Sequence, residues 1–363
     1  MVAPVLEPLA VTSDKARKTG LRLSSADARH LLNLASQPAG RVAPQERQLA
    51  LDMLTLAVPG LATEVLEELS ERVCCMEAPP LPLVRALLAR VPAPMRWRLL
   101  EEAVLPDRVL CEVIAAGAAE DRRIIAGRRK LGPAACAALA ERADAITLRR
   151  LLENAFARPG DVAWRRLIRR GMEETALLAP MVERKDLPVA VAHEIFWPAS
   201  TALRRRILLR FGSESAELER LLTLVETNGK RSSHESLTRM QAVYAALEES
   251  DWDEAIRIVS RDSGIGWDTA RRILRDRGGE ALLVLLKARD AGMGDFRQML
   301  LFLQERRIAR RWTFVHETER LEDLFGRISV NRARMALLYW EWRSRRVGPY
   351  ADCAPLDDGA PGS

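Results

Sequence analysis

The sequence predicts an all-α protein, organised as an α-solenoid of short helical hairpins followed by a C-terminal helical domain. Ala, Leu, Arg and Glu, which favour helix, dominate its 363 residues. Apolar residues make up 48% of the chain and aromatic residues 5%, which argues against general disorder and against an aromatic-rich β-sandwich. No stretch alternates apolar and polar residues with the period of a strand.

The N-terminal part is predicted to contain a disordered segment, residues 1–20, and a helical segment, residues 21–80. The disordered segment is rich in proline and polar residues and lacks apolar periodicity. In the helical segment two apolar faces flank Pro59-Gly60 and predict a helical hairpin. The first face comprises Leu49, Met53, Leu54, Leu56 and Ala57, and the second Leu61, Val65, Leu66 and Leu69.

A repeat is predicted over residues 81–212. Prolines spaced 24 to 29 residues apart open successive apolar segments, namely Pro82, Pro106, Pro133, Pro159 and Pro188. After both Pro106 and Pro188, apolar residues follow at offsets 3, 4, 7 and 8, and each unit has a second amphipathic segment. Because helices of about ten residues are marginal alone, their stability must come from stacking one hairpin on the next. Ile114, Leu139, Leu151, Ile195 and Ile207 are therefore expected to be buried.

Residues 213–346 are predicted to form the C-terminal helical domain, because the proline rhythm ends after Phe211. Its first expected helix is Glu214–Glu226, and a sequence with capping-box spacing begins at Ser232. Further helices are expected over 253–261, 269–276, 281–288, 296–304, 319–328 and 332–343. The tail, residues 347–363, is rich in Gly, Pro and Asp and is expected to be disordered.

The net charge of +6 is unevenly distributed. Residues 81–212 contain 24 Lys and Arg against 15 Asp and Glu, whereas the balance is −2 before this segment and −1 after it. A basic middle segment is the electrostatic footprint expected for an acidic partner. The five cysteines form neither a disulfide framework nor a zinc module, and no apolar run is long enough for a membrane span. We therefore expect a cytoplasmic protein.

The middle of the chain resembles a known family. The relevant segments are LPDRVLCEVIAAGAAEDRRIIAGRRKLGPAACAALAERAD (Leu105 to Asp144), LRRLLENAFA (Leu148 to Ala157) and MVERKDLPVAVAHEIFWPAS (Met181 to Ser200). They are similar to an alphaproteobacterial family of HEAT-like helical proteins, catalogued only as a domain of unknown function, over roughly residues 60 to 300. The resemblance implies a HEAT-like repeat fold in a bacterial cytoplasmic protein. It implies no catalytic residue.

The sequence offers no complete catalytic or metal-binding constellation, so we predict no catalytic residue, no metal site and no cofactor. His193-Glu194 begins like the H-E-x-x-H motif of metalloproteases, but Trp197 occupies the position of the second histidine. Cys111 and Cys136 lie in apolar helical segments and are expected to be inert core side chains. No small-molecule ligand is evident.

Two further features have both a functional and a structural interpretation. Gly264-Ile265-Gly266 joins two predicted helices, which suggests either a helix-turn-helix with Arg271, Arg272 and Arg275 facing DNA, or an ordinary αα-hairpin. Near the C-terminus, the spacing of Met335, Leu338, Tyr339 and Trp342 is that of a core-facing stripe. Trp340 points elsewhere and is expected to pack against a second helix or to remain open to a partner.

Two basic clusters have no acidic residue at the helical spacings that permit local pairing. They are Arg128, Arg129 and Lys130, and Arg204, Arg205 and Arg206. Both are placed on the second helix of a predicted repeat, which would bring them to one side of a solenoid. They form the candidate binding face, with solvation or helix capping as the alternative role.

The leading functional hypothesis is a non-enzymatic protein-binding scaffold or regulatory adaptor, acting through protein–protein interaction. Solenoids offer extended binding surfaces, and no nucleophile, base or metal constellation appears. The alternative is a nucleic-acid-binding protein that uses the basic face of residues 81–212, by analogy with HEAT-like DNA-repair glycosylases.

Overall fold

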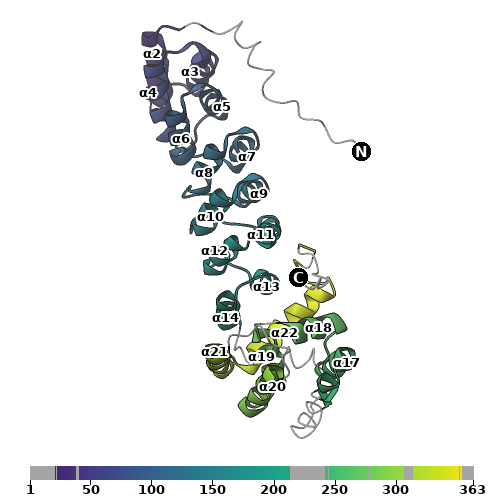
Figure 1. The fold of residues 1–363 in the computed structure, drawn as a ribbon. Helices are drawn as coiled ribbons and strands as arrows, with labels where there is room; N and C mark the ends of the chain where they lie inside the picture. Colours follow the sequence, from purple (N-terminus) through teal and green to yellow (C-terminus); the bar gives the residue numbers. More distant parts are fainter. Residues whose placement is uncertain are drawn as a thin grey trace. The chain divides into compact units, whose positions relative to one another are not determined.

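The computed structural model describes residues 21–37 except 22, residues 41–212, residues 242–305 except 244 and 277, and residues 314–353 except 351. Regular structure in these ranges is helical (Figure 1), and the β-type pairing within them is an isolated bridge between Leu131 and Ala157. The prediction of an all-α protein is confirmed. The predictions for residues 1–20, for the helix 214–226, for the capping sequence at Ser232 and for residues 354–363 lie outside the described residues.

The chain divides into two compact units, Met1–Arg166 and Leu167–Ser363, which we call unit 1 and unit 2. The predicted domain boundaries after residues 80 and 212 remain predictions.

Unit 1 is a succession of short helices in which most helices pack against the one two places further along the chain. Thus α2 packs on α4, α4 on α6, α6 on α8 and α8 on α10, while α3 packs on α5 and α7 on α9. The helices are α2 (Ser25–Ser36), α3 (Pro44–Ala57), α4 (Thr63–Cys74), α5 (Leu81–Arg90), α6 (Ala93–Glu102), α7 (Asp107–Ala116), α8 (Ala119–Ala126), α9 (Pro133–Arg142) and α10 (Ala145–Glu153). Helix α11 (Asp161–Glu173) contains the division between the units.

The prolines that marked the predicted repeat stand at or just before helix starts. Pro82 is the second residue of α5, Pro106 is the N-cap of α7, and Pro133 is the first residue of α9. In unit 2, Pro188 is the N-cap of α13 (Val189–Glu194). Proline suits these positions because its fixed φ matches the helix and its missing N–H would have no intrahelical acceptor there.

The core follows the predicted spacing in the repeat but not in α3. Ile114, Leu139, Leu151, Ile195 and Ile207 are all fully buried, as predicted. By contrast, the predicted apolar face of α3 is only partly right, because Leu54 and Ala57 are buried but Leu49 and Leu56 are 60% and 61% exposed. The buried stripe of α3 consists of Ala50, Leu54 and Ala57. Leu49 and Leu56 are seven residues apart and therefore lie together on a face of α3 other than its buried one.

Unit 2 is built around two helices, α19 (Glu280–Ala288) and α22 (Val330–Ser344), which pack closely on each other. Nearly every residue of α19 is buried, as expected for a helix that is apolar on all sides. Helix α22 also contacts α13, α14 and α18. The other helices are α12 (Leu178–Glu183), α14 (Thr201–Arg210), α17 (Trp252–Ser263), α18 (Trp267–Arg275), α20 (Met293–Glu305) and α21 (Phe314–Arg327). Among the described helices, none has the length and apolar character needed to cross a membrane.

Candidate functional site

Three polar side chains bind pairs of backbone carbonyls at the end of an earlier helix, and we call these contacts carbonyl clamps. Arg128 donates to the carbonyls of Leu100 and, at 2.7 Å, Ala103. Asn154 Nδ2 donates to the carbonyls of Ala126 and Arg128, both at 2.8 Å. Each clamp therefore pairs carbonyls that the end of a helix leaves without an intrahelical donor.

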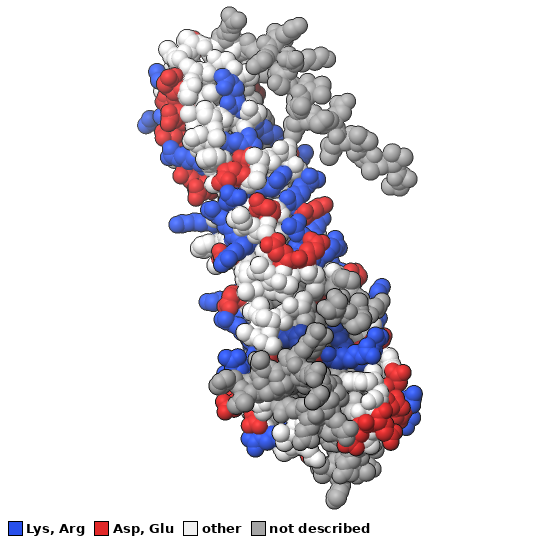
Figure 2. Space-filling model, in the orientation of Figure 1, with Lys and Arg blue, Asp and Glu red and all other residues white. Residues whose placement is uncertain are grey.

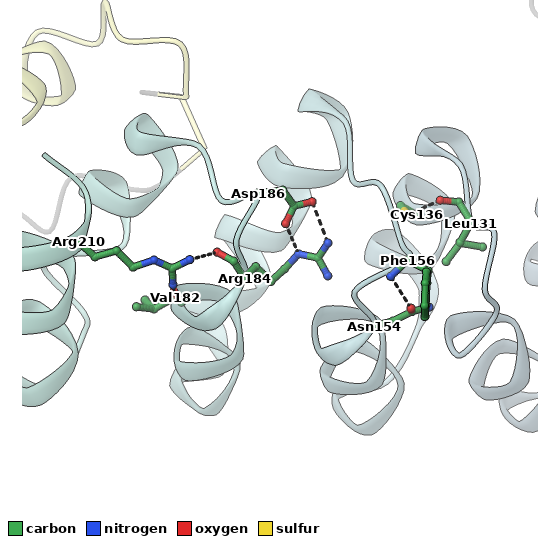
Figure 3. A network of polar contacts seen from close by, with 8 residues as sticks. All are labelled: Leu131, Cys136, Asn154, Phe156, Val182, Arg184, Asp186 and Arg210. Carbon is green, nitrogen blue, oxygen red and sulfur yellow. Dashed lines mark hydrogen bonds and ion pairs between the residues drawn. The ribbon is translucent and has the colours of Figure 1, made fainter. Parts of the chain in front are cut away.

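The third clamp lies in unit 2 and has the same sequence separation. Arg210 donates to the carbonyls of Val182 and, at 2.7 Å, Arg184, which lie 28 and 26 residues earlier (Figure 3). For Asn154 the separations are also 28 and 26 residues. A contact that recurs at the predicted repeat length, in different side chains, indicates that the same local packing is repeated.

A second set of arginines binds a carbonyl eight residues earlier, at the end of the preceding helix or in the turn just after it. Arg96 donates to Leu88, Arg122 Nε donates to Ile114 at 2.9 Å, and Arg204 Nε donates to Phe196 at 3.1 Å. Arginine suits this position because its charged N–H groups form strong hydrogen bonds and its long stem reaches across the turn. Much of the basic excess of residues 81–212 is therefore engaged inside the fold.

This engagement corrects the expectation that Arg128 belongs to an exposed basic face. Arg128 is buried, and burial lowers the pKa of its guanidinium from the usual value. Arg129 and Lys130 are exposed. The three residues follow α8, which ends at Ala126, and so do not lie on the second helix of a repeat as predicted.

The second predicted cluster lies on α14, but its arginines have acidic partners from other helices. Arg204 Nη1 lies 2.6 Å from Asp276 Oδ1 and 3.9 Å from Glu280 Oε2. Arg206 pairs with Glu183, and Arg205 lies 3.8 Å from Asp323. The arginines of this cluster therefore have acidic partners that helical spacing could not reveal, because those partners are distant in sequence.

Two of the three residues nevertheless line a cavity of about 710 Å³ between α14, α19 and α21, which we call the arginine cavity. Its described lining contains five arginines and one acidic residue. The lining residues are Thr201, Ala202, Arg205, Arg206, Leu209, Arg210, Glu280, Arg320, Leu321 and Arg327. Sequence spacing pointed to Arg205 and Arg206, but Arg320 and Arg327 join them only through the fold.

The described lining of the arginine cavity is rich in positive charge. Its five arginines against Glu280 give a formal charge of +4. Asp323 lies 3.4 Å from Arg327 and 3.8 Å from Arg205, and Glu183 pairs with Arg206, so each offsets part of this charge. Glu280 is itself buried beside Arg204. An excess of positive charge in a concave surface favours an anion.

The His193-Glu194 pair is buried and held by packing and hydrogen bonding within unit 2. His193 is buried, its ring stacks on Tyr339 with 5.0 Å between centroids, and Nε2 lies 3.3 Å from the carbonyl oxygen of Phe211. Burial lowers the pKa of His193 to about 4. Burial also raises the pKa of Glu194 to about 7, although Arg343 opposes the shift. In the described part of the chain, no group of three or more metal-ligating side chains is present.

The structure also distinguishes the two interpretations of the glycine turn at Gly264-Ile265-Gly266. The N-terminus of α18 is held by Glu341, which accepts from Gly266 N at 2.8 Å and from the Thr269 hydroxyl at 2.7 Å, while Arg272 lies over Trp197. A recognition helix must offer these N-terminal residues to DNA, so the arrangement is an αα-hairpin.

The predicted core stripe of α22 is only partly right, because Met335 is buried but Leu338 is not, and Ala336 and Leu337 are buried in addition. Trp340 is almost fully buried, with its ring centroid 4.7 Å from that of Phe196 and 5.1 Å from that of Trp197. Tyr339 and Trp342 are only half-buried. Trp340 therefore packs on the turn that follows α13 and is not open to a partner. Of the two cysteines expected in the core, Cys136 is buried, whereas Cys111 is only half-buried.

On the face shown in Figure 2, basic and acidic side chains are interspersed over unit 1 instead of forming one basic field. The chain matches a family described as "Uncharacterised protein conserved in bacteria (DUF2336)" over residues 98–337. This match covers more than half of the chain, which therefore belongs to that family. Neither a curated protein nor a solved structure matches it.

Proposed function

We propose that this member of the family is a non-enzymatic scaffold or regulatory adaptor, built as a HEAT-like α-solenoid, that binds another protein in the bacterial cytoplasm. The observation that carries the proposal is the internal use of the arginines. Arginines of the basic middle segment donate to backbone carbonyls, namely Arg96, Arg122, Arg128, Arg166, Arg204, Arg205 and Arg210. A guanidinium held in this way stabilises the repeat and is less available for a phosphate backbone.

The solenoid part of the proposal is supported by the packing within unit 1 and by the carbonyl clamps. Helices of 8 to 14 residues pack on the helix two places along, and the clamps recur at separations of 25 to 28 residues. Quasi-periodic contacts between neighbouring repeats are the physical basis of solenoid stability.

The protein-binding part is supported by an apolar side chain presented by an ordered turn. Phe156 is 61% exposed, yet its backbone N–H donates to Asn154 Oδ1 at 2.9 Å, beside a carbonyl clamp (Figure 3). A large aromatic held in place on the surface loses little entropy on binding and is a common anchor of protein interfaces. We therefore infer that Phe156 contacts the partner.

Two binding measurements made side by side test this function. For protein binding, the tagged chain is cross-linked in bacterial cells, and a specific partner is expected that Phe156→Ser loses. The matched control is Val347→Ser, because Val347 in unit 2 is similarly exposed at 67%. Equal capture by both variants would contradict the role of Phe156.

For nucleic acid, duplex DNA is titrated at several salt concentrations. We expect little binding at ~150 mM salt. Tight binding whose salt slope falls by about two units in Arg129→Ala/Lys130→Ala, at about 0.9 per phosphate contact, would instead establish the nucleic-acid alternative. The double variant is suitable because both side chains are exposed and lie outside the carbonyl clamps.

A further inference from the structure

We propose that the arginine cavity of unit 2 binds a small molecule that carries two or more phosphate groups. This site goes beyond the proposed protein-binding function and does not rest on it. The cavity, about 710 Å³, falls within the range of roughly 300–1,000 Å³ that is usual for small-molecule sites. Half of its lining residues are arginines.

The chemistry of the lining selects an oxyanion. The planar guanidinium offers parallel N–H groups that match the oxygens of phosphate, and it stays charged at any physiological pH. Thr201 and Ala202, the first two residues of α14, also line the cavity. The N-terminus of this ten-residue helix adds a positive partial charge and hydrogen-bond donors next to the arginines.

The placement of the arginines favours a ligand with more than one phosphate. Arg206 of α14 and Arg327 of α21 form exposed ion pairs that a phosphate can replace, and Arg320 also comes from α21. Arg205 and Arg210 of α14 are engaged by backbone carbonyls and contribute mainly positive charge. Arg205 links the two walls, because its Nη2 donates to the carbonyl of Arg320 at 2.7 Å. A ligand with several phosphate groups can contact arginines of both helices at once.

Among the described residues that line the cavity, none has an aromatic side chain. These residues offer a nucleobase no stacking surface, and they offer single-stranded nucleic acid no platform on which its bases could stack. Recognition must come from the phosphates. Pyrophosphate should consequently bind about as tightly as a nucleoside diphosphate.

Arg206 and Arg327 are the positions at which to test the site. Arg206 pairs with Glu183 and Arg327 with Asp323, and in both pairs the two side chains are largely exposed. Exposed pairs contribute little to stability, so an entering phosphate can replace the carboxylates. Arg205 and Arg210 also donate to backbone carbonyls and are less suitable, because their loss would disturb the fold.

Isothermal titration calorimetry of the full chain with pyrophosphate, tripolyphosphate, orthophosphate, ADP and citrate tests the proposal. We expect pyrophosphate and tripolyphosphate to bind more tightly than orthophosphate, and ADP to match pyrophosphate within a few-fold. Arg206→Gln and Arg327→Gln should each weaken pyrophosphate binding by about tenfold. Arg257→Gln on α17 is the matched control, because Arg257 is equally exposed and pairs with Glu254. It should leave the affinity unchanged.

Several results would overturn the proposed site. These are no pyrophosphate binding at millimolar concentration, equal binding by wild type and by the Arg206→Gln/Arg327→Gln double variant, and citrate binding as tight as that of pyrophosphate. A short single-stranded oligonucleotide that binds through Arg206 and Arg327 while pyrophosphate does not would also overturn it. Thermal unfolding of each variant without ligand shows whether the fold is retained. The partner-capture experiment reports on the protein-binding function separately.

Discussion

Arg343 of α22 and Glu194 of α13 are buried partners that lie 149 residues apart in sequence. Arg343 Nε lies 3.5 Å from Glu194 Oε2, and Arg343 Nη1 donates to the backbone carbonyl of Glu194. Both side chains are almost inaccessible to solvent. The pair connects the end of α13 to the last helix of unit 2, and it accounts for the burial of two charged residues.

Removing one member of this pair should destabilise the protein strongly. Arg343→Met leaves the Glu194 carboxylate buried without its cation, and we expect a loss of about 3 to 5 kcal/mol in the free energy of unfolding. The double variant Arg343→Met/Glu194→Gln should recover most of that loss. Denaturant titrations of the four proteins in this double-mutant cycle measure the coupling. Additive losses would show that the residues do not interact.

Glu194 and His193 should affect the pH dependence of stability in opposite directions. The raised pKa of Glu194, about 7 against 4.5, contributes stability that is complete below pH 4.5 and is lost as pH rises through 7. The lowered pKa of His193, about 4 against 6.5, contributes stability that is complete above pH 6.5 and is lost as pH falls through 4. Between pH 4.5 and 6.5 the loss of the Glu194 contribution with rising pH is largely offset by the gain of the His193 contribution, so their sum changes little.

Glu194→Gln should expose this cancellation. The stability of wild type relative to the variant should fall by an amount on the order of 3 kcal/mol as pH rises from 4.5 to above 7. Denaturant unfolding at several pH values measures this difference, and other titrating groups affect both proteins equally. A difference that stays constant across the range would show that the Glu194 pKa is not raised.

The Asn154 side chain, which forms a carbonyl clamp, should contribute more to the free energy of unfolding than the exposed side chain next to it. Asn154→Ala removes the donor to the carbonyls of Ala126 and Arg128 and the acceptor for the N–H of Phe156. We expect a loss of about 2 to 4 kcal/mol, because these part-buried backbone groups lose their partner. Glu153→Ala, at an exposed position, should change stability by less than about 0.5 kcal/mol. Similar losses of stability for both variants in thermal or chemical unfolding would show that the clamp does not stabilise the fold.

Two isoleucines of unit 1 provide a matched test of the predicted core. Ile114 is fully buried, whereas Ile146 is 66% exposed. Ile114→Ala should cost about 2 to 5 kcal/mol, since it creates a cavity, and Ile146→Ala should cost much less. Circular dichroism should show helix with little strand in both variants. Comparable destabilisation by the two substitutions would contradict the assigned packing.

The sequence predicted the repeat better than it predicted the candidate site. Pro82, Pro106 and Pro133 marked helix starts because a proline acts on its own backbone, which is a local effect that the sequence contains directly. The exposure of Leu49 and the burial of Trp340 depend on which helix face meets a neighbour. Local periodicity offers several neighbouring stripes and does not choose among them.

The arginines show a second limit of sequence reasoning. Arg204 pairs with Asp276, 72 residues away, and Arg128 binds the carbonyl of Leu100, which has no side-chain signal at all. Charge spacing within one helix cannot reveal such partners. The spacing of the residues that form carbonyl clamps is nevertheless a signal that the sequence contains. Arg128, Asn154 and Arg210 are separated by 26 and 56 residues, which is about one and two repeat lengths.

The stability difference between Arg128→Gln and Arg129→Gln tests the central claim most directly, namely that the arginines of the middle segment hold the repeat together. The two residues are adjacent, but Arg128 is buried against the carbonyls of Leu100 and Ala103 and Arg129 is exposed. Chemical unfolding should show a loss of about 2 to 4 kcal/mol for Arg128→Gln and less than about 0.5 kcal/mol for Arg129→Gln. Equal and small losses for both variants would contradict the account.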